Sequence, residues 1–297
     1  MRMSHGLMVP LGMALLGIAA CTGAAAPPPE ADPAGGGAGG GMVDHATSTG
    51  MAAGGHEAGG GFFPAGLGDD ALVARYFLAG ETPGVVRDAG PGAHDLDVLT
   101  AGDNLSFGGG IGRRGLVWNR AGAEDGAVEP IGEARLRQVF AGATALTVEV
   151  VLDLMAAHRN GSRVFHFGSD NRGGRVSLQA RSSHEISFTV EDQTVRLWRW
   201  LFPRERRTVV HVTFDGARPP RERVQLYANG SLVAPAFIQA APASLMADAD
   251  DRLWLGNRDG QNRSFEGTLH YAAAYRTSLP SSAVRAHVVR LLANDDP

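Results

Sequence analysis

The sequence predicts an all-β fold of two packed antiparallel sheets from about residue 69 onward. Short runs in which apolar and polar residues alternate recur along this stretch, and Gly, Asn and Ser separate them. A period of two is typical of strands with one buried face. One run ends at Asn229-Gly230, a dipeptide typical of a two-residue hairpin turn. Strands at this spacing favour a sandwich over a parallel α/β sheet.

Six runs carry the alternation most clearly, and in each the apolar residues are expected to face the core. They are 74–78, 148–152, 176–180, 186–190, 210–214 and 224–228. The polar pair Ser182-Ser183 predicts a turn between the third and fourth runs. Only residues 281–293 are expected to form a helix, because Val284, Val288 and Leu291 recur at helical spacing behind Pro280.

The N-terminus has the features of a secretory signal. A basic residue, Arg2, precedes the apolar stretch 6–20, which is shorter than the ~20 residues of a membrane-spanning helix. Ile18-Ala-Ala-Cys21 resembles the bacterial lipobox. We therefore expect residues 1–20 to be a lipoprotein signal peptide and Cys21 to be acylated. A secretory signal with an incidental buried cysteine is the alternative. Thr22 favours the outer membrane as the location.

Residues 21–68 are rich in Gly, Ala and Pro, and this composition predicts a disordered tether. His45 and His56 within it are interpreted as solvated. Cys21 is the only cysteine, so the domain that we assign to residues 69–297 has to be stabilised by its core, without a disulfide. The net charge is −4 and the arginines are interspersed with acids, which argues against a nucleic-acid partner.

Seven segments, in order, resemble the strands of LamG-like jelly rolls. In the C-terminal half, Arg223-Val-Gln-Leu-Tyr-Ala-Asn-Gly-Ser-Leu-Val233 is similar to the family's "LYVDG-x-L" pattern, and Ser264-Phe-Glu-Gly-Thr-Leu269 to its "F-x-G-x-L/I" strand. The other segments are 72–77, 147–152, 208–216, 253–257 and 271–284. On these motifs the chain is identified as a member of the concanavalin A-like lectin/glucanase superfamily.

The resemblance implies a two-sheet jelly roll whose relatives bind sugars or proteins, some through calcium, while others are glycoside hydrolases. Two features depart from the family pattern. Arg207-Thr208 replace its tryptophan–histidine pair, and residues 105–133 form a longer, Gly-rich insertion. We interpret the insertion as a loop that shapes a ligand site, with a disordered segment as the alternative.

Catalytic motifs are not found in the sequence. The Glu-x-Asp-x-x-Glu spacing of laminarinase-type relatives is missing, and so are a Gly-x-Ser-x-Gly serine and a His-Glu-x-x-His zinc motif. Glu149 and Asp153 would share a strand face, but about 13 Å of backbone separates them, against the ~5–9.5 Å that glycosidase carboxyls require. We interpret the pair as a solvated or sugar-facing polar edge. The histidines show no ligand-like spacing, and hydrogen-bonded structural roles are expected for His158, His166, His184, His211, His270 and His287.

Two groups of residues are candidates for ligand binding. Trp198 and Trp200 flank Arg199, and if exposed the two indoles would form a platform on which sugar rings stack. The alternative is that both indoles lie in the core. The polar segments containing Asp170 and Asn171, and Asn257 and Asp259, offer hydrogen bonds to a ligand or, through Asp170 and Asp259, oxygens to calcium. The alternative, which we favour, is that these residues form ordinary turns.

The sequence therefore predicts a lipid-anchored envelope protein that displays a non-catalytic domain, most simply one that binds a glycan. The alternatives are an adhesion or assembly module for an envelope protein partner and a divergent glycan-cleaving enzyme.

Overall fold

The computed structural model describes residues 69–78, 84–100, 103–108, 114–130, 135–169, 174–203, 206–258 and 262–293. The predicted signal peptide at 1–20, Cys21, the predicted tether with its two histidines, and three candidate ligand residues lie outside the described residues. Those three are Asp170, Asn171 and Asp259. None of the helices in the described ranges is long and apolar enough to cross a lipid bilayer.

The first sheet has eight antiparallel strands. Its order is β14-β13-β12-β7-β17-β5-β4, and β1 pairs with β17 beside this path. The strands are β1 (Leu72–Phe77), β4 (Leu105–Gly108), β5 (Gly115–Trp118), β7 (Ala145–Ala156), β12 (Thr208–Asp215), β13 (Val224–Ala228), β14 (Ser231–Val233) and β17 (Glu266–Tyr275).

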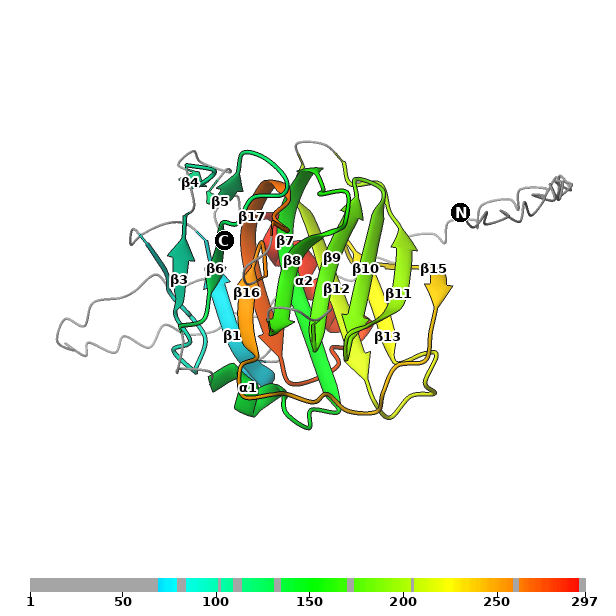
Figure 1. Cartoon of the computed structure of the whole chain (residues 1–297). Coiled ribbons are helices and arrows are strands. Elements are labelled where there is room, and N and C mark those ends of the chain that lie inside the picture. The colour runs from blue at the N-terminus through cyan, green and yellow to red at the C-terminus, as the bar shows by residue number, and fades with distance from the viewer. Residues whose placement is uncertain are drawn as a thin grey trace, which may run out of the picture. The chain divides into compact units, whose positions relative to one another are not determined.

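The second sheet has nine strands in the order β15-β11-β10-β9-β8-β16-β6-β3-β2, and it lies in front of the first in Figure 1. They are β2 (Val85–Val86), β3 (Leu96–Leu99), β6 (Gly126–Val128), β8 (Ser162–Gly168), β9 (Val176–Ser182), β10 (Glu185–Val190), β11 (Gln193–Arg199), β15 (Pro235–Ile238) and β16 (Arg252–Leu255). The two sheets confirm the predicted sandwich.

The main core lies between the sheets and is built by the predicted alternation. Val148, Val150 and Leu152 of β7 face Val176 and Leu178 of β9 across this core, where they are all buried. The short helix α1 (Arg135–Phe140), which the sequence analysis did not predict, contributes to the same core. Phe140 of α1 packs edge-on against Phe167, with 4.6 Å between ring centroids.

The predicted hairpin joins β13 to β14. Ala228 pairs with Ser231, so the turn consists of Asn229 and Gly230, whose φ angles are 48° and 79°. Positive φ at both central residues defines the type I′ turn, in which the backbone twist matches that of the strands. This prediction is confirmed.

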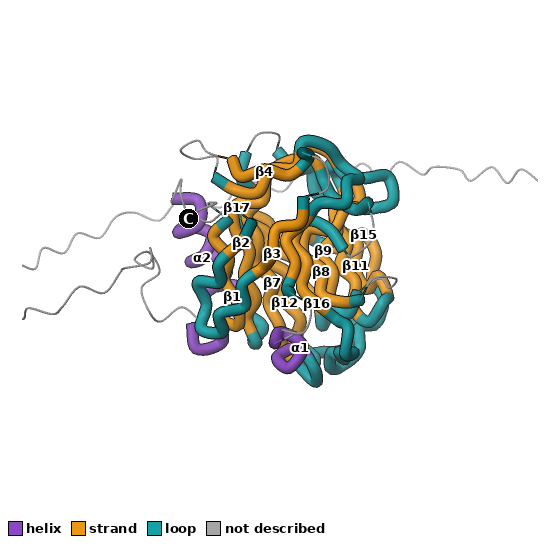
Figure 2. The backbone as a smooth tube through the Cα atoms, turned by 60° about the vertical axis from the view of Figure 1, so that its left-hand side comes forward, coloured by secondary structure: helices purple, strands orange, loops and turns teal. Residues whose placement is uncertain are grey.

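The helix α2 (Ser281–Ala293) has the predicted bounds and covers the outer face of the eight-stranded sheet. Val284, Val288 and Leu291 are buried there against Val151 and Val209, which point away from the main core. Figure 2 shows α2 on the side of the molecule opposite to β9, β11 and β15. The outer face of the nine-stranded sheet is therefore the face that α2 leaves uncovered.

The Gly-rich insertion does not form a single loop beside a ligand site. Its described residues supply β4 and β5 to the eight-stranded sheet and β6 to the nine-stranded sheet. Trp118 of β5 is buried and donates a hydrogen bond through Nε1 to the carbonyl of Asp125 (3.1 Å). Because its apolar side chains complete the core, the interpretation as a loop was wrong for these residues.

Candidate functional site

The predicted tryptophan platform does not form. Trp198 is only 1% exposed and belongs to the core between the sheets, and Trp200 is half-buried against the same core. Alternation does place the two indoles on one face, but it is the inner face, where burial of a large ring is most favourable. The exposed platform is therefore ruled out, whereas the alternative, that the indoles lie in the core, is confirmed for Trp198 and holds in part for Trp200. Arg199, between them, is exposed.

Asn257 is a structural residue and does not face a ligand. Its buried Nδ2 donates to the carbonyls of Ala123 (2.8 Å) and Asp125 (3.1 Å). Its Oδ1 accepts from the backbone N–H groups of Arg258 (2.9 Å) and Arg263 (3.0 Å). With both donors and both acceptor positions used, Asn257 closes the loop between β16 and β17, and its assignment as a ligand contact was wrong.

The outer face of the nine-stranded sheet is polar along β9 and β10. Ser177 and Gln179 point away from the core, as do Ser187 and Thr189 on the neighbouring strand. Gln179 donates from Nε2 to Oγ1 of Thr189 (2.7 Å). All four side chains are buried, so this row of hydroxyl and amide groups packs within the fold and does not itself form an open surface.

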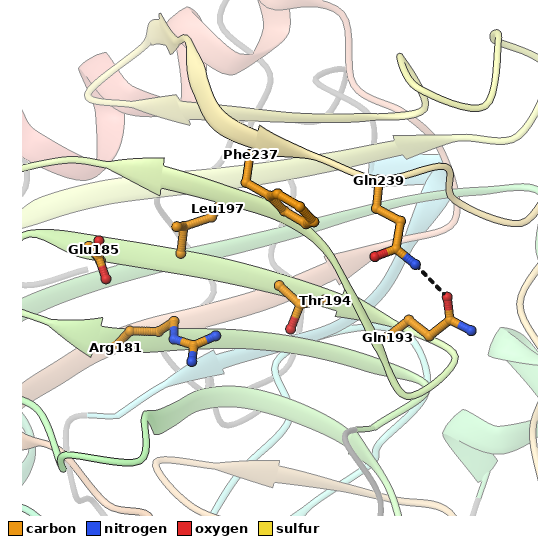
Figure 3. A pocket seen from close by; sticks show the side chains of 7 residues that line it. All are labelled: Arg181, Glu185, Gln193, Thr194, Leu197, Phe237 and Gln239. Atoms are coloured by element: carbon orange, nitrogen blue, oxygen red, sulfur yellow. Dashed lines mark hydrogen bonds between the residues drawn. The ribbon is translucent and has the colours of Figure 1, made fainter. Parts of the chain in front are cut away.

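A shallow pocket of about 550 Å³ lies on this face toward the β15 edge. We call it the sheet pocket. It is lined by Arg181, Glu185, Gln193, Thr194, Leu197, Phe237 and Gln239, from β9, β10, β11 and β15 and the residue after β15 (Figure 3).

The lining of the sheet pocket combines apolar and hydrogen-bonding groups. The ring of Phe237 is 46% exposed and lies next to the side chain of Leu197 (Figure 3). Gln239 donates from Nε2 to Oε1 of Gln193 (2.8 Å), so the two amides hold each other in position while keeping further donors and acceptors. An exposed ring beside fixed amides suits a sugar, whose C–H face stacks on aromatic rings and whose hydroxyls form hydrogen bonds.

The sequence analysis missed the sheet pocket. Its aromatic residue, Phe237, lies in the short run Pro235-Ala-Phe-Ile238, which has no clear alternation. All four residues of β15 are exposed because the strand is at the sheet edge. The available signal was the position of this apolar run. It follows the Asn229-Gly230 hairpin directly, where the chain is long enough for one more strand.

A second cluster of polar side chains lies beneath α2. Glu149 of β7 is fully buried and accepts hydrogen bonds at Oε2 from Nε2 of His211 and Nδ1 of His287, both at 2.6 Å. Its Oε1 accepts from the hydroxyl of Tyr275 (3.0 Å). We call these four residues the helix-pinning cluster. The interpretation of Glu149 as part of a solvated or sugar-facing edge was wrong, because α2 covers it.

Electrostatics favour an ionised Glu149 in this cluster. Burial by itself raises the pKa of the carboxyl, but the charge of His211 and hydrogen bonds from both histidines outweigh it and lower the pKa well below 4.5. A buried carboxylate is therefore stabilised by two imidazole donors and one phenol.

The donor set of Glu149, His211 and His287 also suits zinc, since one ligand atom from each lies within 4.8 Å of the others. Ligands ~2.0–2.1 Å from a tetrahedral ion lie about 3.3 Å apart. The two N···O separations of 2.6 Å are instead hydrogen-bond lengths. The geometry therefore favours hydrogen bonds over a metal, and it agrees with the structural roles expected for His211 and His287.

Comparison with known proteins adds the family. A family model described as the concanavalin A-like lectin/glucanases superfamily matches residues 133–285. No match was found among curated proteins.

Several solved structures have a similar fold. Trypanosoma rangeli sialidase in complex with 2,3-difluoro-KDN has a TM-score of 0.55 and 16% identity, and the match covers 75% of this chain and 33% of the sialidase chain. The same sialidase with sialic acid has a TM-score of 0.54 and 15% identity, with the same coverage of 75% and 33%. A structure from work on botulinum neurotoxin type C, whose cell entry depends on interaction with two ganglioside molecules, has a TM-score of 0.53 and 12% identity. The match covers 75% of this chain and 52% of the toxin chain. This chain thus spans about a third of the sialidase and about half of the toxin chain.

Proposed function

Because the chain belongs to the concanavalin A-like lectin/glucanase superfamily, we propose that it is a non-catalytic carbohydrate-binding protein. The sheet pocket, on the outer face of the nine-stranded sheet, is the proposed binding site. The observation that carries the proposal is the exposed ring of Phe237 beside the paired amides of Gln193 and Gln239.

The structural neighbours support a sugar as the ligand. The sialidase was solved in complex with sialic acid, and the neurotoxin interacts with two ganglioside molecules. At 15% and 12% identity the likeness extends to the fold alone. The choice of ligand class for this chain therefore rests on its own pocket, and the neighbours agree with it.

A binding role without hydrolysis is supported by the charges in the sheet pocket. Among the residues that line it, Glu185 is the single carboxylate. Glycoside hydrolysis by the common mechanisms needs two carboxyl groups ~5–9.5 Å apart on either side of the scissile bond. A pocket with one carboxylate can hold a sugar by hydrogen bonds, but it has no acid–base pair in its described lining.

We also propose that the protein is anchored in the cell envelope, at the outer membrane, through acylated Cys21. The lipobox-like Ile18-Ala-Ala-Cys21 supports this. Labelled palmitate should be incorporated into the wild-type chain and not into Cys21→Ala, and the variant should leave the membrane fraction. Equal labelling of both chains would overturn the anchoring proposal.

A protein partner is the second candidate function, and one observation favours it. β15 is an edge strand on which Phe237 and Ile238 are both exposed, together with two further exposed residues. An exposed apolar edge can pair with a strand of another protein. The same Phe237 would then contact a polypeptide instead of a sugar.

The test is a glycan panel probed with the purified full chain, with and without calcium. Phe237→Ala should weaken binding of the bound glycans about three- to tenfold, the worth of one stacking contact. Leu292→Ala is the matched control, because Leu292 is similarly exposed (41%) but lies on α2. Absence of binding to every glycan, in both calcium conditions, would overturn the proposal. Capture of an envelope protein that depends on Phe237 would then favour the second candidate.

A further inference from the structure

A buried arginine on the nine-stranded sheet has unsatisfied donors. Arg163 of β8 is 7% exposed, and its Nε and Nη1 atoms are buried with no hydrogen-bond partner in the part of the chain that the structure describes. Two other buried arginines of the described structure are fully engaged. Arg175 forms ion pairs with Glu191, Asp248 and Asp251, and Arg196 donates to three backbone carbonyls. Burying a charge without a partner is costly, so the position of Arg163 calls for an external anion.

The described charges that act on the pKa of Arg163 are all positive. Burial, together with the guanidinium groups of Arg258, Arg263 and Arg181, lowers its pKa to about 9. No carboxylate among the described residues acts on Arg163 to offset them. Burial and the charges of Arg163 and Arg258 also lower the pKa of the neighbouring His166 well below 6.5. Within the described ranges, four arginines therefore gather on this part of the sheet, in a protein whose net charge is −4.

Strand pairing and backbone hydrogen bonds position the main chain at these four arginines. Arg163 pairs with Gln179 across β8 and β9, and Arg181 follows two residues later on the same outer face of β9. The Oδ1 atom of Asn257 accepts the backbone N–H groups of both Arg258 and Arg263. The backbone N–H of Arg163 donates to the carbonyl of Arg263 (2.8 Å), which ties this loop to β8.

The four arginines differ in exposure. Arg163 is buried, whereas Arg181 is exposed and Arg258 and Arg263 are half-buried, and we call these last three the rim arginines. Arg181 also lines the sheet pocket, so the positive site and the pocket are continuous through this residue. We call Arg163, Arg181, Arg258 and Arg263 the arginine group.

We propose that the arginine group is an anion subsite that receives the carboxylate of an acidic sugar, while the sheet pocket receives the neighbouring part of the same glycan. The planar guanidinium fork matches a carboxylate, with two N–H groups donating to its two oxygens. An anion held by the three rim arginines would also offset the buried charge of Arg163. This inference rests on the carbohydrate-binding function proposed above and names the class of its ligand, a carboxylated glycan.

The test compares acidic glycans with their neutral counterparts on the purified full chain. The probes are sialyllactose against lactose, oligogalacturonate against its carboxyl-reduced form, a sulfated oligosaccharide, and inorganic sulfate alone. The carboxylated probes should bind at least about tenfold more tightly than their neutral partners, and the preference should shrink as salt is raised.

Two variants test the arginine group. Arg181→Gln changes an exposed side chain and should reduce the acidic preference about tenfold. Arg163→Met should do the same and, because it removes an uncompensated buried charge, should melt no lower than the wild type. Arg285→Gln is the control, since Arg285 is exposed on α2 at the opposite face. Binding of acidic glycans should be unchanged in this variant.

The outcomes separate this inference from the proposed function. Equal affinity for acidic and neutral glycans would overturn the anion subsite and leave carbohydrate binding standing. An acidic preference that both variants retain would overturn the role of the arginine group. Binding of inorganic sulfate as tight as that of the carboxylated glycans, or a preference for the sulfated probe, would overturn the carboxylate assignment. Binding to no glycan at all would overturn both proposals.

Discussion

Replacing Glu149 with glutamine should loosen α2 from the eight-stranded sheet. The carboxylate accepts two hydrogen bonds of 2.6 Å from His211 and His287 and one of 3.0 Å from Tyr275. Glutamine keeps the shape, but it replaces one oxygen with an NH₂ group that cannot accept a hydrogen bond. If the NH₂ group takes the place of Oε2, both imidazole donors lose their acceptor, and if it takes the place of Oε1, the hydroxyl of Tyr275 loses its acceptor. In either orientation the negative charge that these donors stabilise is gone.

Glu149→Gln should lower the free energy of unfolding by about 3–5 kcal/mol, as does the removal of one partner from a buried, hydrogen-bonded charge pair. For a chain of this size, 1 kcal/mol lowers the Tm by about 2–4 °C, so Glu149→Gln should melt roughly 6–20 °C below the wild type. His287→Gln tests the α2 side of the same contact. Because both changes break one shared interaction, their effects in the double variant should fall short of the sum by about 0.5–3 kcal/mol.

The effect also has a defined pH dependence. The pKa of Glu149 is lower in the folded protein than its ordinary value of 4.5. A carboxyl of this kind binds more protons in the unfolded state, so its stabilisation is present above pH ~4.5 and is lost as the pH falls toward the folded pKa. The difference in Tm between wild type and Glu149→Gln should therefore be full at pH 7 and shrink below about pH 4.5.

Thermal melts of the full chain, followed by circular dichroism between pH 3 and pH 7, measure all these quantities. An equal Tm for wild type and Glu149→Gln at pH 7 would refute the reasoning. So would additive effects of the two single variants, because they would mean that Glu149 and His287 do not share an interaction.

Three further predictions follow from the same structure. Trp198→Ala should destabilise the fold by about 3–5 kcal/mol in urea unfolding, because it empties a core position. Leu201→Ala, at an exposed site, should change the free energy of unfolding by less than about 0.5 kcal/mol. Similar effects of the two variants would contradict the burial of Trp198. Gly230→Ala should cost about 1–2 kcal/mol, because φ is +79° in the type I′ turn, and an unchanged Tm would argue against that turn. A chelator should leave the Tm at pH 7 unchanged if the helix-pinning cluster is hydrogen-bonded, and a fall in Tm that zinc reverses would show a metal there instead.

Much of the fold was predictable because it is specified locally. The alternation in β7 identifies Val148, Val150 and Leu152 as core residues from a few neighbouring positions. Asn229 and Gly230 specify their turn through their own backbone preferences, and the periodic apolar face of 281–293 specifies α2. The strands in residues 105–133 and the helix α1 were missed, since short, Gly-rich or weakly periodic segments carry little local signal.

The candidate sites were much less predictable, for a related reason. Alternation shows that Trp198 and Trp200 share a side of the chain, but it does not show whether that side meets the other sheet or solvent. Glu149 was expected at a solvated or sugar-facing edge, but it is buried, because α2 covers a sheet face that would otherwise be open to water.

The sequence by itself determined that this protein is a β-sandwich of the lectin/glucanase superfamily with a C-terminal helix, because pairing, turns and helix periodicity depend on neighbouring residues. Only the tertiary structure decided which polar residues act together. His211 and His287 meet at Glu149 from three distant segments, and Arg163 meets Arg181, Arg258 and Arg263 in the same way. Such groupings depend on strand order and on which sheet face a helix covers, and these are settled by the packing of the whole domain.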